Sequence, residues 1–260
     1  DGVDFISDTP SAPGRFLVDN TGAPMPKATR PIPFALILPS QPQGGTYANL
    51  PVVLWHHGLN NTKQSAFGVA DALCHAGLAV FAHDAPFHGS RGASAVDNVH
   101  NLTGAPGADG FGDLDPLGGL VGLFDFAGSA SVAPLDPRAI RDGFRQAAID
   151  IDQAARAVAE ADPLPLRTAT GLVDLSFRGN RLGYFGESLG GIVGSLAASA
   201  THRIGAFVVS VPGGGILTEL LPNTPQFRDL AFMIIANTLG LMPGDLDAGP
   251  VKTEPTLSLF

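Results

Sequence analysis

The chain has 260 residues, of which 45% are hydrophobic and 15% charged, so it can bury one large core or two small ones. Its formal net charge of −9 argues against nucleic acid or an anionic membrane surface as a partner. Its single cysteine excludes an internal disulfide, and no apolar run reaches the roughly 18 residues of a membrane span. The sequence begins at Asp1 without a methionine or a signal peptide, and we expect an exported protein from which a leader has been removed.

The first third of the chain predicts an extended arm followed by alternating strands and a helix. Residues 1–32 are rich in Pro, Asp and Gly and form the expected arm, with a short strand at 16–18. Strands are expected at residues 33–39, 50–55 and 78–82, and a helix at 63–76 that stops at Gly77. The run at 50–55 is continuously apolar, which indicates a strand covered on both faces.

The rest of the chain continues the alternation after an irregular stretch. Residues 92–135 are dense in Gly, Pro and Asp without clear periodicity and indicate an insertion. Asp136-Pro137 then begins a long amphipathic helix that Asp162-Pro163 closes. A strand at 181–185, a helix at 189–199, a strand at 204–211 and helical pieces at 216–221 and 226–241 follow. We therefore predict an α/β fold, a mostly parallel sheet with helices on both faces, over residues 33–215, followed by a lid-like segment and tail at 216–260.

The segment around Ser188 carries the strongest chemical signal. It reads Gly186-Glu187-Ser188-Leu189-Gly190, after a strand-like run and before a helix-like run. This context makes Ser188 a candidate nucleophile on a sharp strand–turn–helix elbow. Glycine is needed on both sides of the serine because a side chain there would collide with neighbouring backbone.

Two further motifs occur at the ends of the preceding strands. His56-His57-Gly58-Leu59 follows the strand at 50–55, and Asp84-Ala-Pro-Phe-His88-Gly-Ser-Arg91 follows the strand at 78–82. With the elbow, these motifs resemble the α/β-hydrolase family over roughly residues 33–215. By position, the resemblance implies that the backbone N–H groups of Leu59 and Leu189 form an oxyanion hole. It implies that Asp84 and Arg91 order a loop. We expect His57 and His88 to be structural residues of these loops as well.

The resemblance implies a serine-dependent carboxyl-ester hydrolase, an esterase or lipase, that needs no metal and no organic cofactor. A small, hydrophobic ester is the expected substrate, because the insertion at 92–135 and the apolar stretch at 227–242 could shape an acyl pocket. A thioesterase, peptidase or acyltransferase would use the same nucleophile. The sequence does not separate these activities.

The general base of such an enzyme is not found where the family has it. In the family the acid and then the histidine follow the serine along the chain, but the last histidine here is His202 and residues 216–260 contain none. We therefore expect a separate C-terminal part of the same precursor to supply both groups and to cover the edge of the sheet. Two alternatives stay open: recruitment of an upstream histidine such as His57 or His88, or a non-catalytic relative that binds a ligand or partner.

Overall fold

The computed structural model describes residues 1–6, 15–59, 61–91, 97–99, 103–108, 137–161, 163–168, 171–213 and 223. Most of the expected insertion at 92–135 therefore lies outside the described residues. The same is true of the expected lid-like segment and tail at 216–260, apart from Asn223.

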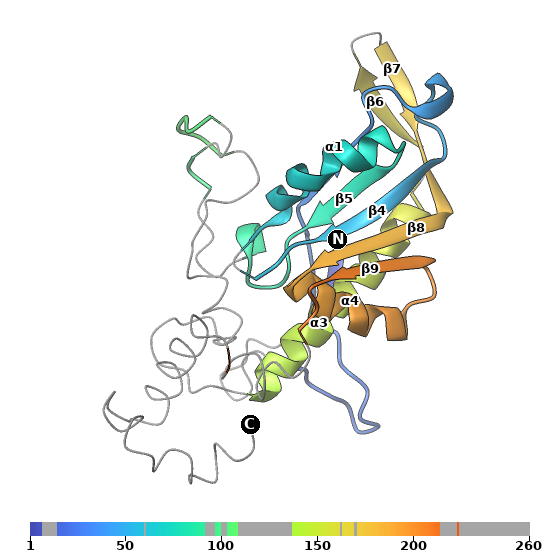
Figure 1. Cartoon of the computed structure of the whole chain (residues 1–260). Coiled ribbons are helices and arrows are strands. Elements are labelled where there is room, and N and C mark those ends of the chain that lie inside the picture. Colours follow the sequence, from blue (N-terminus) through green and yellow to red (C-terminus); the bar gives the residue numbers. More distant parts are fainter. Residues whose placement is uncertain are drawn as a thin grey trace.

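A five-stranded sheet forms the centre of the fold (Figure 1). Its strands are β3 (Phe34–Ile37), β4 (Leu50–His56), β5 (Ala79–His83), β8 (Phe177–Glu187) and β9 (Ala206–Ser210). They lie in the order β3-β5-β4-β8-β9, and β3 alone is antiparallel to its neighbour. The predicted mostly parallel sheet is confirmed, and β4, the continuously apolar run, pairs on both sides.

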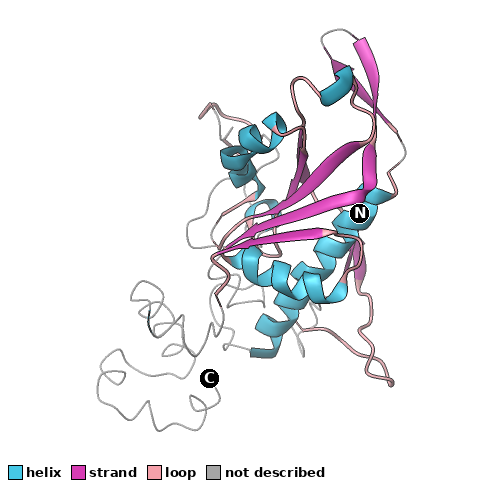
Figure 2. Ribbon diagram, turned by 45° about the vertical axis from the view of Figure 1, so that its right-hand side comes forward, coloured by secondary structure: helices cyan, strands magenta, loops and turns pink. Residues whose placement is uncertain are grey.

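Helices cover both faces of this sheet, as predicted (Figure 2). On one face a 3-10 helix, η2 (Lys63–Ala66), leads into α1 (Phe67–His75). On the other lie α3 (Pro137–Ala159) and α4 (Leu189–Ala200), which pack against each other and against β8. Gly77 ends α1 as the sequence predicts: it has a φ of 81°, and its N–H donates to Cys74 O at 2.9 Å.

The core is divided between the two faces by the alternation of side chains along the strands. Val52 and Leu54 of β4 belong to the larger cluster, with Leu182 and Tyr184 of β8 and the inner faces of α3 and α4. Trp55 belongs to a smaller cluster with Ala66 and Ala70 under α1. Each face of the central strands β4, β5 and β8 is thus covered by its own helices, and this holds the ends of these strands in fixed positions.

Two small antiparallel sheets were not predicted. β1 (Gly2–Asp4) pairs with β2 (Ala28–Arg30), whereas the expected strand at 16–18 makes only isolated bridges to Ile6 and Pro24. β6 (Leu164–Thr168) and β7 (Gly171–Leu175) form a hairpin next to β8 in sequence. Two further 3-10 turns, η1 (Gln43–Gly45) and η3 (Gly89–Arg91), lie in loops.

The N-terminal arm packs on α3. Gln146 accepts from Phe5 N at 2.9 Å and donates to Val3 O at 3.0 Å, and Gln153 also binds the backbone of Val3. Among the described helices, none combines the length and the apolar character that crossing a membrane requires.

Candidate active site

Ser188 occupies a strained turn between β8 and α4. Its φ of 51° and ψ of −109° are rare for a residue with a side chain. Its N–H donates to Ser210 O of the neighbouring strand at 2.9 Å, which helps to hold that conformation. Glu187, the last residue of β8, is exposed, and Ser188 is half-buried. The strand–turn–helix elbow expected from the sequence is therefore present.

The two glycines beside the serine are required by close backbone contacts. A Cβ on Gly186 would lie 2.3 Å from Gly190 O, and a Cβ on Gly190 would lie 2.3 Å from His56 O. Both obstacles are backbone atoms that are themselves held in place. The hydroxyl of Tyr184 donates to Gly190 O at 2.6 Å, and burial raises the pKa of this phenol. The elbow is thus packed from both sides.

The loop after β4 lies directly against the elbow. A Cβ on Gly58 would lie 3.4 Å from Ser188 Cβ, and Gly190 N donates to His57 O at 3.1 Å. Leu189 is the first residue of α4, so its N–H has no acceptor within the helix. In the described part of the chain, neither this N–H nor that of Leu59 makes a hydrogen bond. Two unused backbone donors therefore belong to residues immediately next to Ser188 and Gly58.

His57 supports this loop with both nitrogens of its ring. Its Nδ1 lies 2.8 Å from Gly58 O, and its Nε2 accepts from Ala85 N at 3.0 Å. Only the neutral ring with its proton on Nδ1 can make both bonds. Burial and the neighbouring His56 hold the pKa of His57 well below its usual range. The ring thereby joins the loop after β4 to the loop after β5.

Three other histidines are buried around His57. Each directs Nδ1 at a backbone carbonyl: His56 at His57 O, His83 at Asp84 O and His88 at Pro86 O. Burial lowers the pKa of all three, that of His56 to about 3. Within the described residues, Nε2 of His56 and of His88 has no hydrogen-bond partner. These rings are neutral parts of the packing.

Asp84 is the centre of the loop after β5. Its side chain is fully buried and accepts from Lys63 N at 2.7 Å, Lys63 Nζ at 2.8 Å, Ser90 N at 3.0 Å and Ser90 Oγ at 2.7 Å. Burial alone would raise the pKa of the carboxyl, but the Lys63 ammonium and these hydrogen bonds hold it below its usual value. Gly89 has a φ of 50°, and a Cβ there would lie 2.6 Å from the Asp84 carboxyl. Residue 89 must therefore be glycine, because a side chain there would collide with the Asp84 carboxyl.

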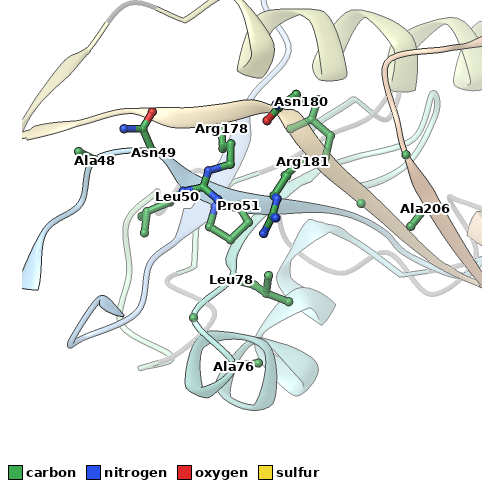
Figure 3. Close-up of a pocket in the computed structure, with 14 residues that line it drawn as sticks. Ala48, Asn49, Leu50, Pro51, Ala76, Leu78, Arg178, Asn180, Arg181 and Ala206 are labelled. Atoms are coloured by element: carbon green, nitrogen blue, oxygen red, sulfur yellow. The ribbon is translucent and has the colours of Figure 1, made fainter. Parts of the chain in front are cut away.

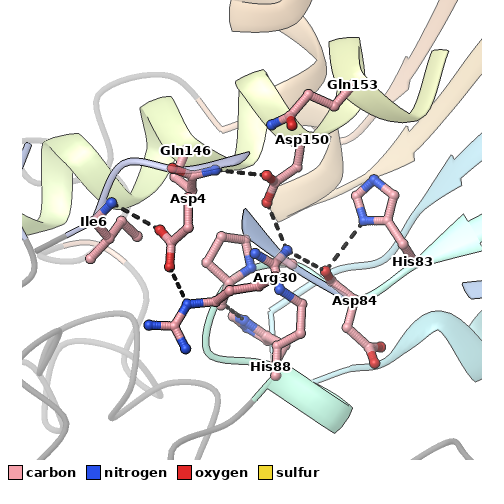
Figure 4. Close-up of polar contacts among 12 residues, drawn as sticks. Asp4, Ile6, Arg30, His83, Asp84, His88, Gln146, Asp150 and Gln153 are labelled. Carbon is pink, nitrogen blue, oxygen red and sulfur yellow. Dashed lines mark hydrogen bonds and ion pairs between the residues drawn. The ribbon is translucent and has the colours of Figure 1, made fainter. Parts of the chain in front are cut away.

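The network extends from Asp84 to Asp150 and Gln146 of α3 (Figure 4), and Arg91 connects the two parts. Its Nη1 donates to Asp84 O at 2.9 Å and to Asp150 Oδ2 at 2.7 Å, and Gln146 donates to the other oxygen of Asp150 at 2.7 Å. Asp84 and Arg91 thus make the contacts of residues that order a loop. Sequence reasoning missed Lys63, Gln146 and Asp150. The sequence feature that could have identified them is a polar residue at a position on the inner, otherwise apolar face of a helix.

The remaining described histidines lie away from Ser188. His202 follows the far end of α4, about 18 Å from its start at the normal helical rise. His75 ends α1 and is exposed. Nowhere in the described ranges do three or more His, Cys, Asp or Glu side chains gather so that they could hold a metal ion.

No protein-family model matches the chain, and no curated protein sequence matches it. Solved structures that it resembles include acetyl xylan esterase 1 from Thermoanaerobacterium sp., with 17% identity and a TM-score of 0.44 over 80% of this chain and 57% of that one. A cold-adapted esterase from an Arctic intertidal metagenomic library has 21% identity and a TM-score of 0.40 over 74% and 62%. The 2,6-dihydroxy-pseudo-oxynicotine hydrolase has 14% identity and a TM-score of 0.41 over 86% and 47%.

The chain thus spans between 47% and 62% of the length of these three structures. They are esterases and a hydrolase, and their TM-scores to this chain lie between 0.40 and 0.44. The α/β class rests instead on the parallel sheet, its two helical layers and the elbow.

Proposed function

We propose that this chain carries the nucleophile and oxyanion hole of a serine-dependent carboxyl-ester hydrolase. The observation that carries the proposal is the backbone of Ser188, at φ 51° and ψ −109° between β8 and α4. A strained turn of this kind persists only where the surroundings impose it, and such turns concentrate at functional sites. Here two glycines and the hydrogen bond from Ser188 N to Ser210 O impose it.

In the proposed reaction Ser188 Oγ attacks the ester carbonyl, and the negative charge that develops on the carbonyl oxygen is held by the N–H groups of Leu59 and Leu189. Fixed donors of this kind stabilise the transition state by about 3 kcal/mol each. The hydrogen bonds of His57 to Gly58 O and Ala85 N hold the loop that presents the Leu59 donor. Asp84, His88 and Arg91 act one step further away, by fixing the loop that carries Ala85.

We propose that the general base comes from outside the described residues. A serine hydroxyl needs a base to become a useful nucleophile. His57 has both ring nitrogens occupied, which disfavours its recruitment, and His56, His83 and His88 are buried within the same network. We propose that a separate C-terminal part of the same precursor supplies histidine and acid.

The outer strand β9 supports a further covering segment. Val208 and Val209 point to opposite faces of β9 and are 55% and 37% exposed, and Val211 beyond it is 72% exposed. A parallel sheet normally has both faces covered. A polypeptide that adds to this edge would bury these valines and could bring its own side chains to the elbow.

The proposal of a hydrophobic ester substrate depends on segments outside the described residues. Export of the protein stays a prediction from the sequence.

Labelling with a fluorophosphonate probe, which reacts with activated serines, tests the proposal on the protein as it is isolated, with any co-purifying polypeptide. Ser188→Ala should abolish labelling and lower the hydrolysis of a p-nitrophenyl ester by about a thousand-fold or more. Ser195→Ala is the matched control, because Ser195 lies on α4 and its hydroxyl only donates to Gly191 O. Equal labelling of wild type and Ser188→Ala would overturn the proposal.

A second candidate function is that of a ligand-binding module on this scaffold. It is favoured by one observation: both ring nitrogens of His57, whose loop lies against the elbow, are taken up by hydrogen bonds to Gly58 O and Ala85 N. Denaturing mass spectrometry separates the two. A co-purifying polypeptide that contains histidine favours the enzyme, and a single species without ester hydrolysis favours the binding module.

A further inference from the structure

The pairing of β8 with β4 is irregular next to Pro51, near the start of β4. Pro51 lies in β4, which pairs with β5 on one side and β8 on the other. The register shifts at this point, because Leu50 pairs with Phe177 whereas Val52 pairs with Leu182. Residues 178–181 of β8 therefore lie opposite Pro51 alone.

The bulge brings two arginines to one side of the sheet. In a regular strand Arg178 and Arg181, three positions apart, would point to opposite faces. In this structure both line the same cavity, on either side of Pro51 (Figure 3). Gly179 fixes the bulge from behind, since a Cβ there would lie 2.9 Å from Ala159 O at the end of α3. Bulges commonly re-aim side chains in this way.

The cavity has about 660 Å³ and lies at the edge of the sheet where the parallel strands begin. This is the opposite end of β8 from Ser188. Its walls come from the start of β4, the segment between α1 and β5, the bulge of β8 and the start of β9. Among the described residues that line it, the polar side chains are Asn49, Arg178, Asn180 and Arg181, and none is acidic. Its volume falls in the range of small-molecule sites.

The charge of the two guanidinium groups is not compensated within the described residues, where no ion pair involves Arg178 or Arg181. Arginines elsewhere in the same fold lie against carboxylates, as Arg30 does with Asp4 and Arg91 with Asp150. In a chain with a net charge of −9, two neighbouring cations without a carboxylate are conspicuous. Asn49, held at a φ of 56° by the bond from its N–H to Ser176 Oγ, adds an amide beside them.

We infer that this cavity binds a small organic phosphate. Two guanidinium groups present forks of N–H donors that match the oxygens of a phosphate dianion. The amides of Asn49 and Asn180 suit hydroxyl groups, and Leu78, Pro51 and Ala206 offer apolar surface to the body of the ligand. This site is independent of the proposed function, because it uses neither Ser188 nor the oxyanion loop.

Isothermal titration calorimetry at constant ionic strength tests the inference with three probes: inorganic phosphate, glucose 6-phosphate and succinate. We expect saturable binding of both phosphates, with glucose 6-phosphate tighter because it also meets the amides. Phosphate binding without a gain for the sugar phosphate would assign the site to free phosphate. Succinate binding as tightly as the phosphates, or no saturable binding of either phosphate, would overturn the inference.

The variant Arg178→Gln/Arg181→Gln should weaken phosphate binding by about ten-fold or more, because charge-assisted hydrogen bonds are the strong ones. Arg167→Gln is the control, since Arg167 is an exposed arginine of the β6–β7 hairpin outside the cavity. Equal weakening by the control would show a non-specific charge effect and overturn the inference. Thermal melting of each variant without ligand establishes that the fold is intact.

Discussion

The two ends of β8 differ in how their polar groups are satisfied. At its carboxyl end, Gly186 to Ser188 lie among backbone bonds and buried side chains that leave no room for change. At its amino end, Arg178 and Arg181 face a cavity of about 660 Å³, and the described residues that line it include no carboxylate. The elbow at one end of β8 is thus fixed by close packing. The cavity at the other end is characterised by two arginines without a carboxylate partner among the described residues.

From this difference we expect substitutions near Ser188 to lower the stability of the fold more than substitutions at the arginine cavity. Around Ser188 each loop is held by the next: His57 binds Ala85, Ala85 follows Asp84, and Asp84 binds Lys63. A change there propagates because buried polar groups lose partners that water cannot replace. At the arginine cavity the side chains are exposed, so water replaces whatever is removed. Three changes test this contrast, in order of decreasing effect on stability.

The largest effect is expected from Lys63→Met. It removes the cation from a buried ion pair whose side chains are 2% and 0% exposed and leaves the Asp84 carboxylate without its counter-charge. Breaking such a pair from one side costs about 3–5 kcal/mol of unfolding free energy. Arg178→Met, at the other end of the sheet, should change stability by no more than about 0.5 kcal/mol. Urea unfolding of both variants gives the comparison, and equal effects would contradict it.

A smaller effect is expected from Gly190→Ala. The added Cβ would lie 2.3 Å from His56 O and 2.8 Å from His56 C, so the loop after β4 or the elbow must move. Overpacking of this kind costs about 1–3 kcal/mol. Gly68→Ala is the matched control, because nothing lies within 4 Å of a Cβ there and alanine favours the helix by up to about 1 kcal/mol. Thermal unfolding should therefore move in opposite directions for the two variants.

The smallest effect per group is expected from pH. Burial lowers the pKa of His56 from 6.5 to about 3 in the folded chain, and those of His57, His83 and His88 are lowered as well. Above about pH 6.5 these rings are neutral in both states and their contribution to stability is fully present. As the pH falls below 6.5, the unfolded chain takes up protons that the folded chain does not, so stability is lost towards the folded pKa values.

For His56, whose folded pKa is about 3, the loss approaches about 1.4 kcal/mol per pH unit below 6.5, and the other three histidines add a loss in the same direction. Urea midpoints measured from about pH 7.5 down to about pH 5 should fall, and His56→Asn should make the fall less steep by about one proton. The lowered pKa of Asp84 adds a further loss of stability only below the usual carboxyl pKa of 3.8. Between about pH 7.5 and about pH 5 the loss therefore comes from the histidines and not from Asp84. Stability that is constant over this range would contradict the prediction.

Local sequence signals predicted most of the sheet and the elbow. The apolar runs placed β4, β5 and β9, and the apolar period after Asp136-Pro137 placed α3. They did not predict the β6–β7 hairpin or the pairing of β1 with β2. β1 and β2 are three residues each and lie far apart in the sequence, so no local pattern reveals their pairing.

The sequence by itself determined where the chain must bend. Gly186 and Gly190 allow the strained turn at Ser188, and Gly77 allows α1 to end in the left-handed conformation. Only the tertiary structure decided what those bends bring together. The Nε2 of His57 accepts a hydrogen bond from the N–H of Ala85, and Arg178 and Arg181 line one cavity. These contacts depend on strand order and register, which arise from packing over the whole sheet. No short stretch of sequence therefore predicts them.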